Sequence, residues 1–146
     1  MKHLIFLLLL SFNIQSQILK PQDRVIPAIT DVTQQLQDKL FTEPSFMQPI
    51  VYIDYSPLFP GILGLTRKIG AGVYMIDLSP LCTSEELEFI LLHELVHVWQ
   101  LHTGILGKGK GCFIYRGVQY QYWFPYKLRP WEKEADRIAE EVCNPE

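Results

Sequence analysis

The chain has 146 residues, of which 48% are hydrophobic and 20% are charged, and its formal net charge is −3. This length and composition predict one globular domain with a hydrophobic core. Without a basic excess, there is no electrostatic reason to expect a nucleic-acid or anionic-lipid partner.

The first residues, MKHLIFLLLLSFNIQSQ, have the pattern of a secretory signal peptide. A positive start at Lys2 and His3 precedes the apolar run LIFLLLL, and Ser16 is a small residue suited to cleavage. The run is far shorter than the ~20 residues that span a bilayer. We therefore expect residues 1–16 to be a signal peptide. Residues 17–146 would then form one secreted or periplasmic domain with no membrane span.

Helix and strand patterns follow in chain order. Residues 22–41 carry apolar side chains at helical spacing and predict a helix. Segments 50–55 and 73–78 are rich in β-branched and aromatic residues and predict strands. Segment 57–72 between them is rich in glycine and proline, so it predicts turns around a short strand at most.

The main helix is predicted to begin at residues 83–84 and to run to about residue 102. Thr83 and Glu86 fit a capping box, and further acidic residues fall in the first turn, where the helix dipole favours them. Gly104 marks the end. The middle is apolar on nearly all sides, which predicts a buried central helix.

The remaining chain predicts a loop and a final helix. Residues 104–130 are rich in glycine and then in aromatic side chains, and predict a long loop with room for a hairpin. Residues 131–143 predict a helix, since Pro130 stands at the start and acidic residues fill the first turn. This order of elements favours the α+β class.

Three cysteines, Cys82, Cys112 and Cys143, make an odd count. In an exported chain this favours one disulfide and one free thiol, with the pairing left open. A Cys/His zinc cluster is the alternative, but no CxxC spacing supports it.

The sequence HELVH, residues 93–97, places three ionisable groups in the apolar main helix. Residues four apart share a helix face, so His93 and His97 can bind one zinc ion. Glu94 lies about 100° further round, which suits a general base beside the metal. The alternative is a pair of buried histidines satisfied by hydrogen bonds, but a core gains nothing from neutralising three polar groups.

Zinc needs a third protein ligand. His102 lies about 140° around the helix from His97 and should point elsewhere. The metzincin pattern HExxHxxGxxH is absent, because Gln100 and Thr103 occupy its glycine and histidine positions.

The final helix offers the missing ligand in PWEKEADRIAEE. Glu132 can bind the zinc ion, and Asp136, four residues on, can accept the free N–H of a ligating imidazole. Glu134 is the competing ligand, but it lies about 200° from Glu132 and has no carboxylate four residues later. A solvated acidic helix face is the alternative interpretation of these carboxylates.

HELVH followed by EKEAD resembles the gluzincin branch of the zincin metallopeptidases, and EADRIA is similar to the corresponding motif of small exported bacterial-type peptidases. The resemblance covers residues 84–102 and 130–140. It implies a minimal zincin-like domain with a small antiparallel-edged sheet. It also implies zinc ligation by His93, His97 and Glu132, a general base and acid at Glu94, and a supporting carboxylate at Asp136.

The resemblance further implies an edge strand before the active-site helix, which position assigns to residues 73–78, and on which a peptide substrate can pair. Zincins also use a Tyr or His to stabilise the oxyanion. Neither type follows the third-ligand motif, so the candidates are Tyr115, Tyr120, Tyr122 and Tyr126.

The predicted function is zinc-dependent hydrolysis of peptide bonds. Two alternatives stay open: a non-catalytic module in which zinc stabilises a small fold, and a zinc amidase that acts on a cell-wall component.

Overall fold

The structure is a computed structural model of the chain and describes residues 6–9, 39–40 and 49–144. The helix predicted over 22–41 lies outside these residues, except for Lys39 and Leu40, which are helical. The signal peptide predicted over 1–16 lies outside them too, apart from strand β1 (Phe6–Leu9). It stays a prediction.

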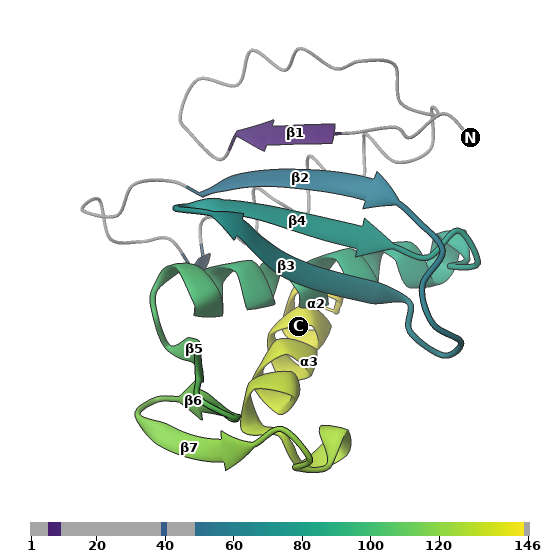
Figure 1. The fold of residues 1–146 in the computed structure, drawn as a ribbon. Coiled ribbons are helices and arrows are strands. Elements are labelled where there is room, and N and C mark those ends of the chain that lie inside the picture. Colours follow the sequence, from purple (N-terminus) through teal and green to yellow (C-terminus); the bar gives the residue numbers. More distant parts are fainter. Residues whose placement is uncertain (1–5, 10–38, 41–48, 145–146) are drawn as a thin grey trace.

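A four-stranded mixed sheet forms one layer of the fold, with strand order β1-β2-β4-β3 (Figure 1). The predicted strands β2 (Ile50–Tyr55) and β4 (Val73–Leu78) are confirmed, and they pair in parallel. β1 pairs antiparallel with β2, and β3 (Gly64–Gly70) pairs antiparallel with β4. Both edges of the sheet are therefore antiparallel.

The edge strand beside the main helix differs from the prediction. β4 lies between β2 and β3, so the prediction that residues 73–78 form the edge is wrong. The turn-rich segment instead contains the seven-residue strand β3, which takes the edge position. Its central residues are polar, as edge strands often are. Gly72, with φ of 67°, closes the turn into β4.

Helix α2 (Ser84–His102) begins and ends where the sequence predicts. The Thr83 hydroxyl accepts a hydrogen bond from the Glu86 backbone N–H at 3.3 Å, and the Glu86 carboxylate accepts one from the Thr83 N–H at 3.0 Å. This capping box fixes the start. At the other end, Gly104 has φ of 75° and allows the chain to turn away.

Helix α3 (Pro130–Cys143) confirms the predicted final helix and packs on α2. α2 thus lies between the sheet and α3, which explains why its sequence is apolar on nearly all sides (Figure 1). The shared core consists of Val51, Ile53, Tyr74, Ile76, Leu78, Leu91, Leu92, Leu95, Val96, Val98, Ala135, Ile138, Ala139 and Val142.

A second sheet occupies the segment predicted as a loop with a hairpin. Strands β5 (Leu106–Gly109), β6 (Cys112–Tyr115) and β7 (Val118–Gln121) form an antiparallel meander, followed by the 3-10 helix η1 (Tyr126–Leu128). Two-residue turns ending in Gly111 and Gly117, both with positive φ, join the strands. Leu106, Tyr115 and Trp131 form a small separate core that attaches this sheet to the start of α3.

In the described part of the chain, helices α2 and α3 and two small sheets are compatible with the predicted α+β class. None of the helices described is long and apolar enough to cross a membrane. The three cysteines are free, so the predicted disulfide is not formed. They lie on separate elements: the loop before α2, strand β6 and the end of α3.

Candidate metal centre

Two imidazoles on α2 face one another across one helical turn. The Nε2 atoms of His93 and His97 are 3.0 Å apart, and the rings meet edge to face. This arrangement follows from their spacing of four residues, as predicted from HELVH.

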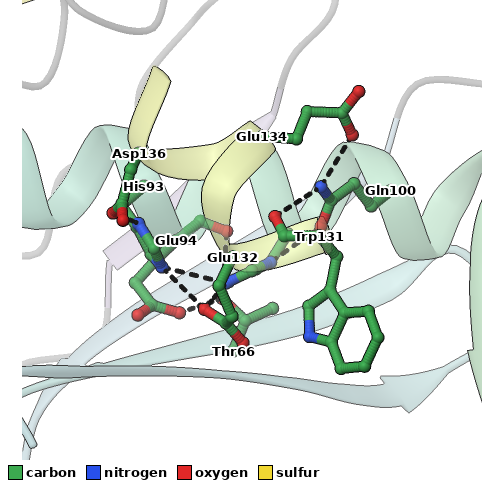
Figure 2. Close-up of polar contacts among 9 residues, drawn as sticks. Thr66, His93, Glu94, Gln100, Trp131, Glu132, Glu134 and Asp136 are labelled. Atoms are coloured by element: carbon green, nitrogen blue, oxygen red, sulfur yellow. Dashed lines mark hydrogen bonds and ion pairs between the residues drawn. The ribbon is translucent and has the colours of Figure 1, made fainter. Parts of the chain in front are cut away.

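The first turn of α3 brings a carboxylate to the same point. Glu132 Oε2 lies 3.3 Å from His93 Nε2 and 3.1 Å from His97 Nε2 (Figure 2). Trp131, which is 2% exposed, anchors that turn in the second sheet. The predicted convergence of Glu132 with the two histidines of HELVH is therefore confirmed.

The three side chains fit a zinc ion. Tetrahedral ligands at about 2.0–2.1 Å from zinc are about 3.3–3.4 Å apart, and the three atoms here are 3.0–3.3 Å apart. The side chains of His93, His97 and Glu132 are only 8%, 12% and 10% exposed. Together these residues form a group that could hold a metal ion.

Hydrogen bonds to the other ring nitrogens determine which atoms face the centre. Asp136 Oδ1 lies 2.9 Å from His93 Nδ1, and Gln100 Oε1 lies 2.8 Å from His97 Nδ1. Both partners accept, so each neutral ring carries its hydrogen on Nδ1. In the neutral rings, the two Nε2 lone pairs then face a carboxylate oxygen, and either a proton on one ring or a metal cation has to lie between them. Either one resolves the repulsion among these atoms.

The same electrostatics appear in the pKa values. Burial lowers the pKa of His97, but the hydrogen bond and negative charge of Glu132 outweigh burial, and the net pKa is raised. Burial raises the pKa of Glu132, yet the hydrogen bonds with both histidines leave it well below its usual value. The site therefore favours a carboxylate beside a positive charge.

Glu94 lies beside His93, His97 and Glu132 and is held by the edge strand β3. The Thr66 hydroxyl donates to Glu94 Oε2 at 2.6 Å (Figure 2). Gly64 has no Cβ and so leaves room for the rest of the carboxylate. Glu94 is 5% exposed, and its burial raises the pKa of the carboxyl group, against the lowering effects of His97 and Thr66. A raised pKa suits a group that exchanges protons near neutral pH.

A cleft of about 630 Å³ opens onto these residues. Strand β3 and the loop before it form one wall, while β5, β6 and η1 form the other. Apart from the site itself, Lys108 and Arg129 are its charged lining residues, and most of the others are apolar: Ile62, Leu63, Leu65, Phe89, Ile90, Leu101, Leu106, Phe113 and Trp131.

The other candidates lie elsewhere, with one exception. Glu134 is not a ligand, because it binds Gln100 and Arg116 instead. His102 lies against Tyr74, with Nδ1 3.3 Å from the hydroxyl, and stays out of the centre. Among the four candidate tyrosines, Tyr126 is the one that lines the cleft. Partial burial and then the negative charge of Glu132 raise the pKa of its phenol.

Sequence reasoning missed Gln100 and Thr66. Gln100 is polar in an apolar helix and lies three residues after His97, so the two side chains share a helix face. That spacing could have predicted their contact. Thr66 offered none, because its contact depends on how β3 lies against α2.

The chain was also compared with protein-family models, curated proteins and solved structures. None of these comparisons found a match.

Proposed function

We propose that this protein is a zinc-dependent peptidase of minimal zincin-like architecture. One observation carries the proposal: two imidazole nitrogens and the oxygen of Glu132 converge within 3.3 Å, while Glu94 lies beside them in the same cleft. The resemblance of HELVH and EKEAD to gluzincin motifs supports the same reaction class.

The chain would supply positioned donors and a proton carrier. When zinc is bound, it acts as a Lewis acid and lowers the pKa of a coordinated water towards about 7. Thr66 occupies Oε2 of Glu94, which leaves Oε1 to accept a proton from the attacking water. Glu94 can then deliver that proton to the leaving amine nitrogen.

Tyr126 is the proposed oxyanion donor. It lines the cleft, and partial burial, followed by the charge of Glu132, raises the pKa of its phenol. A raised pKa keeps the hydroxyl protonated and able to donate. In this proposal, the hydroxyl donates to the carbonyl oxygen of a peptide bound in the cleft.

Strand β3 is the proposed guide for the substrate. Its outer edge is not paired with another described strand, and the strand forms one wall of the cleft. An extended peptide can add to such an edge through backbone hydrogen bonds. The apolar lining of the cleft suits peptides with apolar side chains near the cleaved bond.

The test is Glu94→Gln, which is nearly isosteric but cannot take up a proton. We expect zinc content to stay at the wild-type level while hydrolysis of a peptide panel falls about 10²–10⁴-fold. Glu85→Gln, on an exposed position of the same helix, is the matched control. Retained turnover in Glu94→Gln would reject the mechanism.

The same assay separates the two alternatives. A wild-type protein that binds zinc but cleaves neither peptides nor cell-wall material is a non-catalytic zinc module. One that cleaves only cell-wall material is an amidase.

A further inference from the structure

Gln100 forms a buried link between α2 and α3. Its side chain has no exposed surface. Oε1 accepts from His97 Nδ1 at 2.8 Å, while Nε2 donates to the Trp131 carbonyl at 3.0 Å and to Glu134 Oε2 at 2.9 Å (Figure 2). Both amide hydrogens are used, so the amide cannot rotate and Oε1 must face His97.

Glu134 is held in turn by the second sheet. Its Oε1 accepts from the Arg116 guanidinium at 2.7 Å, and its side chain is 13% exposed. Arg116 stands at the turn between β6 and β7 with φ of 48°, and its backbone N–H donates to the Ile105 carbonyl at 2.8 Å. A continuous series of contacts therefore runs from this turn to the imidazole of His97.

We propose that Gln100 and Glu134 are positioning residues that hold His97 ready to bind the metal. This inference rests on the zinc site proposed above but not on hydrolysis. Without an acceptor at Nδ1, the imidazole can rotate or move its hydrogen to Nε2, and in either state Nε2 does not offer its lone pair to the ion, so the zinc-binding state is less populated. Gln100 prevents both changes by accepting the Nδ1 hydrogen of His97. Glu134 in turn keeps the Gln100 amide from rotating.

Satisfaction of buried polar groups alone is a weaker explanation. Replacing a group of hydrogen-bonded polar side chains by apolar ones of similar shape can be nearly neutral for stability. Apolar residues at both positions 100 and 134 would need none of these hydrogen bonds. What such a core would lose is the acceptor at His97 Nδ1.

His93 is supported differently. Its partner Asp136 is a carboxylate whose side chain is 53% exposed, whereas the partner of His97 is a neutral amide with no exposed surface. The support of His97 should therefore depend more on rigid placement than on charge.

The experiment compares zinc affinity, by chelator competition, with thermal midpoints measured with and without zinc. The variants are Gln100→Leu, which removes the acceptor at similar volume, and Glu134→Ala, which releases the amide from one side. Glu140→Ala, on an exposed position of α3, is the control. We expect zinc affinity to fall about 10–100-fold in Gln100→Leu. In Glu134→Ala it should fall less, because Trp131 still holds the amide.

The outcomes are distinct. If both variants lower the midpoint equally with and without zinc and bind zinc as the control does, their role is only structural and the inference is overturned. If Gln100→Leu does not fold, Glu134→Ala decides by the same criterion. A wild-type protein that takes up no zinc overturns the proposed function, and this inference falls with it.

Discussion

Gly64 offers a test of whether the edge strand sets the position of Glu94. It has no positive φ, so alanine is allowed by the backbone. A Cβ there would lie 2.6 Å from Glu94 Oε1, 2.7 Å from Glu94 Cγ and 2.9 Å from Ile90 Cγ2. Gly64→Ala therefore acts mainly on the side chain of Glu94.

The size of the effect follows from these distances. Ordinary contacts are about 3.5 Å or longer, so Glu94 has to retreat by about 1 Å. A misplacement of that size costs about 10²-fold in rate. The crowding should also lower the free energy of unfolding by about 1–3 kcal/mol. None of the three atoms nearest to that Cβ belongs to His93, His97 or Glu132, so zinc affinity should change little.

The assay measures kcat and KM on a peptide substrate, together with zinc content, below the thermal midpoint of every variant. Gly107→Ala is a matched control, because Gly107 lines the opposite wall of the cleft and its Cβ would meet nothing within 4 Å. In a Glu94→Gln background, Gly64→Ala should add little further loss. Turnover of Gly64→Ala equal to that of Gly107→Ala, or a loss that follows loss of zinc, would refute the reasoning.

Two further predictions concern different parts of the molecule. Tyr126→Phe should lower kcat about 10²–10³-fold with zinc affinity unchanged. The control is Tyr122→Phe, which removes a hydroxyl that donates to the Gly109 carbonyl instead. Equal kcat in both variants would remove Tyr126 from the mechanism. Arg67→Ala leaves the Asp77 carboxylate, 5% exposed, without the guanidinium that donates to it at 2.7 Å. It should lower the free energy of unfolding by about 2 kcal/mol in urea titration. A loss no larger than that of the exposed neighbour Lys68→Ala would contradict this.

The part of the site that was predictable from sequence depends on local helix geometry. His93 and His97 share a face because they are four residues apart, and Asp136 follows Glu132 by the same step. The convergence of the two helices is not local, but the need of zinc for a third ligand was enough to select Glu132. Glu134 was rejected on its helical angle, and the structure places it on Gln100 instead.

The errors lie where sheet topology decides. Residues 73–78 have the pattern of a strand but carry no sign of its neighbours, and β3 had to be recognised before the edge could be assigned. Its glycines and its polar residues Thr66, Arg67 and Lys68 weaken the strand pattern, since an edge strand is mostly exposed. In the second sheet, Gly111 and Gly117 lie in the turns, but residues 104–130 were predicted as a loop with room for a hairpin and not as three strands.

The residues that hold Glu94 differ from those that hold His97 and Glu132, so turnover and zinc affinity should respond to different substitutions. The contacts of Glu94 come from β3, through Thr66 and Gly64, whereas those of His97 and Glu132 come from α2, α3 and the second sheet. Perturbing the sheet side should therefore change turnover at constant zinc affinity. Perturbing the α3 side should change zinc affinity first. Because the two groups of residues share no hydrogen bond among those described, their effects should combine almost additively in zinc affinity. Strong coupling there would mean that α2 shifts as a unit.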